Sequence, residues 1–171
     1  MKKIEKISIF DFDKTLVRTP ELEEIKKVYK EKTGKEWPYV GCWSKPESLD
    51  MEIFNIPLIK DTAIDYSNEL LNETTLMVMV TGRLRRLEKE VKKILKSHNL
   101  VFDEYHFNTG GSTLKGKLNT FTKLIEKYPQ VKEVELWEDR LEHIPYFEQW
   151  GKMHCKSGDI ESFKVNVIIN P

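Results

Sequence analysis

Short apolar runs alternate along this chain with stretches whose apolar residues recur at helical spacing, and this alternation limits the possible folds most. Residues 7–10 and 76–80 predict strands, and the second run is apolar throughout, as in a central parallel strand that is covered on both faces. Three further candidate strands are residues 101–107, 134–137 and 165–169. About five strands separated by helices predict an α/β domain of three layers with a mainly parallel sheet.

Helix-like segments fill the gaps between these strands. Residues 84–97 and 118–128 have the spacing of crossover helices, and Pro129 ends the second one. Residues 19–73 form an excursion that is far longer than a connection between a strand and a helix needs. We therefore expect residues 1–171 to form a single Rossmann-like domain, with a small, partly helical cap inserted at approximately residues 19–73 after the first strand. Two helices are expected in this insert: one that Thr19 caps, with Pro20 at its first position and Gly34 as its stop, and one at about residues 63–71.

The composition excludes several classes of protein. Hydrophobic residues make up 39% of the 171 residues, which is typical of a globular chain and not of a disordered one. Lys and Arg total 28, as do Asp and Glu, so the formal net charge is +0. Such a chain has no overall field that attracts nucleic acid or an anionic membrane. Any binding of phosphate must therefore depend on a local cluster of cations.

The cysteines and the hydropathy pattern bear on the compartment. Cys42 and Cys155 make neither a disulfide framework nor a zinc quartet, and neither lies in a Cys-x-x-Cys pair. No stretch approaches the ~18 apolar residues that a membrane span requires. We expect a cytoplasmic protein that does not associate with membranes, and the sequence gives no sign of an obligate protein partner.

An acidic pair directly follows the first predicted strand. In an extended chain Asp11 and Asp13 project to one side, while Phe10 and Phe12 project to the other. Ligands of open α/β sheets bind at the carboxyl ends of strands, where this pair lies. Two adjacent carboxylates repel each other unless a cation separates them, and oxygen ligands favour a hard ion such as Mg²⁺. The alternative interpretation is a solvated acidic turn.

A second motif, Thr81-Gly82-Arg83, follows the second predicted strand. Thr81 offers a hydroxyl, Gly82 lets the backbone approach an anion, and the free N–H groups at the start of a helix favour phosphate. The alternative is a capped turn with no ligand. The motif therefore predicts phosphate binding only in combination with the acidic pair.

Two further motifs carry charge that suits phosphate chemistry. One lysine of Lys115-Gly116-Lys117 could hold a phosphate beside an attacking carboxylate, and the other would be solvated. Glu138 and Asp139 form a second acidic pair at a strand end, where they could complete a metal site. The alternative for that pair is an acidic strand end that is neutralised by the neighbouring Arg140.

The order of these motifs from Asp11 to Asp139 resembles the four motifs of the haloacid dehalogenase (HAD) superfamily of phosphotransferases. The resemblance implies that Asp11 is the nucleophile, that Asp13 is the general acid and base, and that one of the lysines is catalytic. It implies substrate binding by Thr15, Thr81, Gly82 and Arg83, and metal binding by Asp11, Asp13, Asp139 and Glu138. The implied cofactor is Mg²⁺.

Lys117 is the preferred catalytic lysine because Phe121 follows it four residues later. The pair resembles the Lys-x-x-x-Phe helix entry in the phosphatase part of polynucleotide kinase-phosphatases. A closer resemblance, to the HAD domain of Swiss Army Knife RNA repair proteins, extends over several further segments. These are Thr19-Pro20, Trp37, Gly41-Cys42-Trp43 and residues 137–143 with Phe147, and Cys42 stands where members commonly have Trp.

The resemblance implies a Mg²⁺-dependent phosphomonoester hydrolase with an aspartyl-phosphate intermediate. Its phosphorylated substrates would be nucleic-acid ends, in particular ends of single-stranded RNA or DNA in RNA repair. Trp37, Trp43 and Phe54 of the insert could stack on bases, or they could form the small core of the insert itself. Two alternatives stay open: a phosphatase of small metabolites, and a non-enzymatic phosphoacceptor or binding module.

Overall fold

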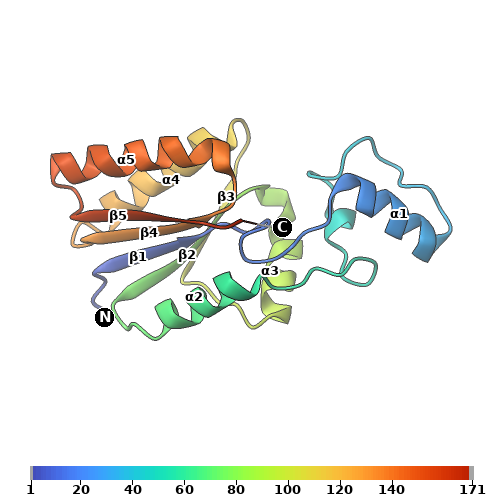
Figure 1. Ribbon diagram of the computed structural model, residues 1–171, viewed down its shortest axis with the longest axis horizontal. Helices are drawn as coiled ribbons and strands as arrows, with labels where there is room; N and C mark the ends of the chain where they lie inside the picture. The colour runs from blue at the N-terminus through green and yellow to red at the C-terminus, as the bar shows by residue number, and fades with distance from the viewer. Residues whose placement is uncertain (1, 170–171) are drawn as a thin grey trace.

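The computed structural model, which describes residues 2–169, is a five-stranded parallel sheet between two layers of helices (Figure 1). The strand order is β3-β2-β1-β4-β5, and all four neighbouring pairs run parallel. The strands are β1 (Lys6–Phe10), β2 (Thr75–Leu84), β3 (Glu104–Asn108), β4 (Glu133–Glu138) and β5 (Ser162–Val167). The predicted α/β class, with a Rossmann-like arrangement of five parallel strands, is confirmed.

Each face of the sheet has its own apolar core. Helices α4 (Thr113–Lys127) and α5 (Ile144–Ser157) cover one face, and α2 (Lys60–Leu70) and α3 (Glu88–Ser97) cover the other (Figure 1). Ile9 of β1 belongs to the first core, whereas Phe10 belongs to the second and stacks on Trp137 with ring centroids 4.2 Å apart. Burial on both faces explains why the central strands are almost entirely apolar.

The predicted helices begin at other residues in the structure: α1 (Leu22–Thr33) at Leu22 and not at Pro20, α2 at Lys60 and not at residue 63, with larger differences in α4 and α3. Helix α4 begins at Thr113 and not at residue 118, because the side chain of Ser112 caps it by accepting a hydrogen bond from the backbone N–H of Lys115 at 3.3 Å. Strand β2 continues to Leu84, so α3 begins only at Glu88, after a 3-10 turn, η2 (Arg85–Leu87). Apolar spacing located α4 and α3 but missed the caps and turns that fix where they begin.

Helix α5 is missing from the prediction. The sequence signals for it are Pro145 in its first turn and Gly158 after its last, the latter in the left-handed region at φ 84°. Phe147 and Trp150 bury its apolar face against the sheet. Strand β5 then begins at Ser162, three residues earlier than expected. Among the helices within residues 2–169, none combines the length and the apolar character needed to cross a bilayer.

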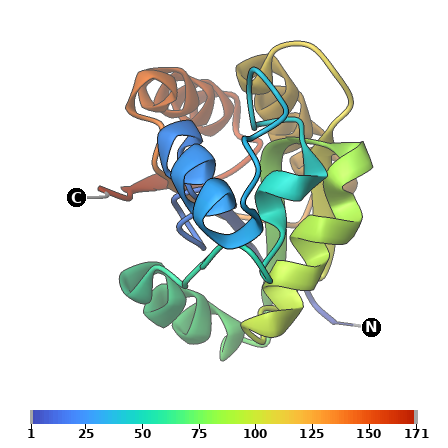
Figure 2. The ribbon, with the colours of Figure 1, turned by 90° about the vertical axis from the view of Figure 1, so that its right-hand side faces the viewer.

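The expected insert divides into two parts in space. Helix α1 (Leu22–Thr33) and the 3-10 turn η1 (Pro46–Leu49) lie beyond the carboxyl ends of the strands, and Figure 2 shows α1 in front of the sheet. Helix α2 instead packs against the sheet, where Tyr66 meets Phe10 edge to face with ring centroids 5.9 Å apart. We use the word cap for residues 19–59, which hold α1 and η1. That the cap acts as a unit of its own stays a prediction.

Two glycines inside helices offer a matched test of packing between α5 and β5. A Cβ atom on Gly151 of α5 would lie 2.1 Å from the Phe163 ring, whereas one on Gly116 of α4 would meet nothing closer than 3.7 Å. We expect Gly151→Ala to destabilise the protein by ~1–3 kcal/mol through overpacking. Gly116→Ala should stabilise it by ~0.5–1 kcal/mol, because alanine favours a helix. Urea unfolding measures both, and equal effects of the two variants would contradict the packing described.

Candidate active site

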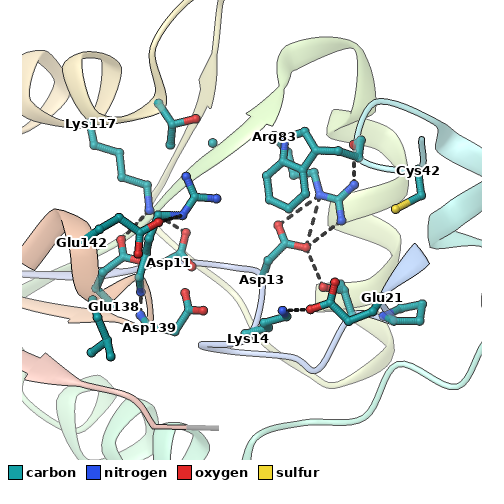
Figure 3. Close-up of a pocket in the computed structure, with 17 residues that line it drawn as sticks. Asp11, Asp13, Lys14, Glu21, Cys42, Arg83, Lys117, Glu138, Asp139 and Glu142 are labelled. Atoms are coloured by element: carbon teal, nitrogen blue, oxygen red, sulfur yellow. Dashed lines mark hydrogen bonds and ion pairs between the residues drawn. The ribbon is translucent and has the colours of Figure 1, made fainter. Parts of the chain in front are cut away.

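A cavity of about 360 Å³ opens where β1, β2 and β4 end, between the sheet and the cap (Figure 3). This is the edge at which open α/β sheets bind ligands. The core contributes most of its charged residues, and the cap contributes Thr19, Pro20, Glu21, Cys42 and Trp43. The charged lining residues from the core are Asp11, Asp13, Lys14, Arg83, Lys117, Glu138, Asp139, Arg140 and Glu142.

Asp11, Lys117 and Glu138 form a buried ionic cluster at the base of the cavity. The Lys117 Nζ atom lies 2.7 Å from Asp11 Oδ1 and 2.6 Å from Glu138 Oε2, and each of the three residues is at most 5% exposed. Burial alone would lower the pKa of Lys117, but Asp11 and Glu138 raise it above its ordinary value. Lys117 is therefore a fixed cation beside the Asp11 carboxylate.

A third carboxylate gives this cluster an excess of negative charge. Asp11, Glu138 and Asp139 can each offer an oxygen atom such that all three atoms lie within 4.8 Å of one another. Burial raises the pKa of Asp11, and Glu138 and Asp139 raise it further against the opposing effect of Lys117. Burial and Glu138 also raise the pKa of Asp139 to about 6. Three carboxylates around one ammonium group fit a hard divalent cation, because such an ion would remove their mutual repulsion.

Asp13 lies in the same cavity as Asp11 but has different partners (Figure 3). Its Oδ1 atom is 2.7 Å from Arg83 Nη2 and accepts a hydrogen bond from the Thr19 hydroxyl, also at 2.7 Å. The Asp13 carboxylate is thus held on the cap side of the cavity and is not part of the carboxylate cluster around Lys117. Of the four residues predicted to bind metal, Asp13 was expected to do so through its backbone carbonyl, and the structure brings together the carboxylates of the other three, Asp11, Glu138 and Asp139.

Arg83, predicted to bind substrate, joins Asp13 to the cap. Besides its bonds to Asp13, its Nη1 atom donates to the backbone carbonyl of Trp43 at 2.5 Å. The guanidinium also lies 4.0 Å from the centroid of the Trp43 ring, which is a cation–π contact. Every nitrogen of this guanidinium therefore already has a partner in the protein.

The predicted phosphate-binding residues separate into two groups. Gly82 lines the cavity, whereas the Thr81 hydroxyl accepts from the backbone N–H of Arg83 at 3.1 Å and Thr81 lines a neighbouring cavity instead. Thr15 is buried beneath Asp11 and donates to its Oδ2 atom at 3.1 Å. Thr113, rather than Thr81, lines the cavity beside Gly82. Its side chain packs so closely there that it would be 2.6 Å from a Cβ atom on Gly82.

None of the sequence motifs described above includes Thr113, and none predicts a chemical role for Thr19. Thr113 is the first residue of α4, after two glycines and a serine cap, and that pattern marks a helix start that can face a phosphate. Thr19 carries no comparable signal, because its bond to Asp13 depends on how the chain turns between them.

The two candidate lysines lie in different places. Lys117 contacts Asp11, whereas Lys115 is exposed and lines the neighbouring cavity.

The aromatic residues of the cap were expected either to form its core or to stack on bases, and the structure places them in two different settings. Trp37 and Phe54 are buried in the apolar core that the cap shares with the sheet. Trp43 is 41% exposed and lines the cavity.

The Arg140 guanidinium lies 6.0 Å from the Trp43 ring and pairs with Glu142 at 3.7 Å, so it does not neutralise the acidic strand end as the alternative interpretation expected.

The raised pKa of Asp139 leads to a prediction about pH and stability. Asp139 ionises near pH 4 in the unfolded chain but near pH 6 in the folded, metal-free protein. Stability therefore falls as the pH rises through this window, since the charged form is unfavourable only when folded. Asp139→Asn should stabilise the metal-free protein, with no gain below about pH 4 and the full gain above about pH 6.

Urea unfolding in EDTA across this pH range measures the effect, and Asp61→Asn, at an exposed helix position, is the matched control. Added Mg²⁺ should reverse the order, because a bound cation stabilises the wild type more than a variant that lacks one carboxylate ligand. A gain that is the same at every pH would contradict the proposed electrostatic cause.

Comparisons with known proteins agree with this geometry. A family model described as HAD domain family 1 in Swiss Army Knife RNA repair proteins matches residues 40–171. An uncharacterized protein of Saccharomyces cerevisiae is 25% identical over 174 residues, which cover 86% of this chain. The chain spans only 37% of the length of that yeast protein.

Three solved structures share the fold. A chain of the Pnkp1/Rnl/Hen1 complex aligns with a TM-score of 0.59 at 14% identity, over 96% of this chain and 45% of that one. The HAD domain of the effector protein Lem4 from Legionella pneumophila gives 0.56 at 11% identity, over 98% and 88% of the two chains. An archaeal beta-phosphoglucomutase from Pyrococcus sp. strain ST 04 gives 0.54 at 17% identity, over 85% and 83%. At these identities the likeness concerns the fold alone.

Proposed function

The chain belongs to HAD domain family 1 of the Swiss Army Knife RNA repair proteins, and from this premise we propose that it is a Mg²⁺-dependent phosphomonoester hydrolase. The observation that carries the proposal is the Asp11 carboxylate, which is held by Lys117 in a cavity that also contains Asp13. Hydrolysis of a phosphate monoester needs a positioned nucleophile and fixed positive charge around the phosphoryl oxygens. The site offers both.

In the first step, a carboxylate oxygen of Asp11 attacks the phosphorus atom, and the bond from phosphorus to the ester oxygen breaks. Asp13 donates a proton to the departing oxygen, so the products are an alcohol and phosphorylated Asp11. In the second step, Asp13 takes a proton from water as the water oxygen attacks the same phosphorus. The bond from phosphorus to Asp11 then breaks, which releases phosphate, restores the Asp11 carboxylate and leaves Asp13 protonated, as it was before the first step.

The remaining residues position these groups. Lys117 and the Thr15 hydroxyl each contact one oxygen of Asp11 and fix its orientation. The backbone at Gly82 and the start of α4 at Thr113 border the cavity and can donate N–H groups to phosphoryl oxygens. Asp11, Glu138 and Asp139 would hold Mg²⁺, which when bound supplies positive charge against the transferred group.

We further propose that the phosphate is that of a nucleic-acid end, in the setting of RNA repair. The family supports this substrate, and the exposed Trp43 ring beside the cavity offers a face for a base. A cytoplasmic setting is part of the proposal, since Cys42 and Cys155 are free thiols, which suits a reducing compartment.

Phosphate release tests the proposal directly. The purified chain is incubated with 3′- and 5′-phosphorylated oligonucleotides, a mononucleotide and a sugar phosphate, in Mg²⁺ and after EDTA treatment. We expect release from an oligonucleotide end in Mg²⁺, loss of release in EDTA, and recovery when Mg²⁺ is restored. Faster release from the sugar phosphate would favour a metabolite phosphatase, and no turnover of any substrate would favour a phosphoacceptor module.

Asp13 gives a separate prediction, because it acts in both steps. Asp13→Asn should slow the attack of water on phosphorylated Asp11 and let this species accumulate when the substrate has a good leaving group. Intact-protein mass spectrometry would then detect the added phosphoryl group. The double variant Asp11→Asn/Asp13→Asn is the control and should stay unmodified. An added phosphoryl group on the double variant would show that another residue accepts it.

A further inference from the structure

A second cavity of about 490 Å³ adjoins the one that holds Asp11. Its walls come from the end of β2, from β3 at the open edge of the sheet, from the loop after β3 and from one side of α4. Thr113 and Lys117 line both cavities. The cavities are therefore neighbours with these two residues at their border, and a ligand whose phosphate lies at Asp11 would have to pass over Thr113 to reach the second one.

The second cavity is rich in cations, which the protein neutralises only in part: the pKa of Glu88 is lowered first by its hydrogen bond to Lys92 and also by its attraction to Arg85. Arg85, Lys115 and Lys123 line it, and within residues 2–169 none of them has a carboxylate within ion-pair distance. The acidic residue among the lining side chains, Glu88, pairs with Lys92 at 2.6 Å. In a chain of net charge +0, this local excess of positive charge suits an anionic ligand.

The spacing of these cations favours an anion with more than one charged group. Lys115 and Lys123 lie eight positions apart on α4, so their Cα atoms are separated by about 12 Å along the helix. Asn119, halfway between them on the same side, also lines the cavity. This row can serve successive phosphates of a strand, with a side-chain amide available for a base or a ribose between them.

One more lining residue suits a nucleotide. His106 of β3 has a side chain that is 34% exposed, and its Nε2 atom lies 3.0 Å from Glu104 Oε2, which fixes the ring at the cavity wall. A partly exposed imidazole at a sheet edge can stack on an unpaired base. A polyanion without bases would use the cations and leave the face of this ring without a base.

From these observations we propose that the second cavity is the binding site for the nucleotides next to the reacting phosphate, and that it holds them as an unpaired strand along α4. The inference rests on the proposed function, since it requires the terminal phosphate to lie at Asp11. It assigns Arg85, Lys115 and Lys123 to phosphodiester contacts and gives them no part in the chemical step.

The test compares two substrates and two variants. The cavity variant is Arg85→Gln/Lys115→Gln/Lys123→Gln, and the control variant, with the same change in charge at exposed sites outside both cavities, is Lys93→Gln/Lys152→Gln/Lys156→Gln. Each is assayed with a phosphorylated single-stranded oligonucleotide and with a mononucleotide across a salt series. We expect the cavity variant to lose at least about tenfold in kcat/KM for the oligonucleotide, and its salt slope to become shallower by roughly 0.7 per lost contact. The mononucleotide rate should not change.

The outcomes separate this inference from the proposed function. Equal losses in the two variants, or equal kcat/KM and equal salt slopes of the wild type for both substrates, would overturn the second cavity as a strand site while hydrolysis stands. Full activity on a blunt duplex end would contradict the proposal that the strand is bound unpaired. If the wild type hydrolyses neither substrate, the proposed function fails. Fluorescence anisotropy of the labelled oligonucleotide, bound to wild type and to both variants, then still decides whether the cavity binds a strand.

Discussion

Replacing Asp11 with asparagine should lower kcat/KM for any phosphorylated substrate by at least about a thousandfold, which is a barrier increase of more than ~4 kcal/mol. The amide keeps the size of the side chain and one oxygen that can accept from Lys117, and its NH2 group can donate to the Thr15 hydroxyl, which now donates to the other Asp11 oxygen. It removes the nucleophilic carboxylate. The chemistry should therefore fail while the fold persists, as measured by phosphate release and by thermal unfolding.

The stability of the same variant adds an independent check. Burial and neighbouring carboxylates raise the pKa of Asp11, so ionised Asp11 is unfavourable in the folded, metal-free protein. Asp11→Asn should thus be at least as stable as the wild type in EDTA at neutral pH. Asp61→Asn serves as the control and should leave activity unchanged. Activity of Asp11→Asn within about tenfold of the wild type would show that Asp11 is not the nucleophile.

Lys117→Met should cost both activity and stability. The variant leaves Asp11 and Glu138 buried without the ammonium group that now lies 2.7 and 2.6 Å from them. Removing one partner of a buried ionic cluster destabilises a protein by ~3–5 kcal/mol. We expect a loss of this size in urea unfolding at pH 7 in EDTA, together with a large fall in kcat/KM because the cation beside the nucleophile is gone.

The stability of Lys117→Met should also depend on pH, because of the same ionic cluster. Without Lys117 the pKa of Asp11 rises further, so acid protonates the buried carboxylate and relieves the cost. The loss of stability in Lys117→Met should shrink as the pH falls. Lys115→Met, two residues away and exposed, is the matched control and should change stability by less than ~0.5 kcal/mol. A larger loss in Lys115→Met would transfer the role to that lysine.

A double variant separates charge from chemistry. Lys117→Met/Glu138→Gln removes one of the two stranded carboxylates and should recover part of the stability that Lys117→Met loses. It should not recover activity, because the cation beside Asp11 is still absent. Recovery of both properties would mean that Lys117 serves only to neutralise Glu138.

The local patterns of the sequence were enough to predict the parallel sheet and the acidic pair after its first strand. The alternation at residues 10–13 holds in the structure: Phe10 and Phe12 are buried in one apolar core, and Asp11 and Asp13 lie in one cavity. Helix α5 was missed even though Pro145 and Gly158 mark its ends. Its apolar residues are spread among polar ones, so that packing on β5, rather than a strong periodic signal, defines it.

The sequence by itself therefore determined the features that depend on neighbours along the chain. These are the strand period, the helix spacing and the set of residue types that suits phosphate chemistry. Only the tertiary structure decided that Lys117, and not Lys115, meets Asp11, 106 positions away. It also decided that Arg83 holds Asp13 and that Thr113 stands between two cavities. The physical reason is the strand order, which places β1 between β2 and β4 and so brings the ends of distant segments to one edge of the sheet.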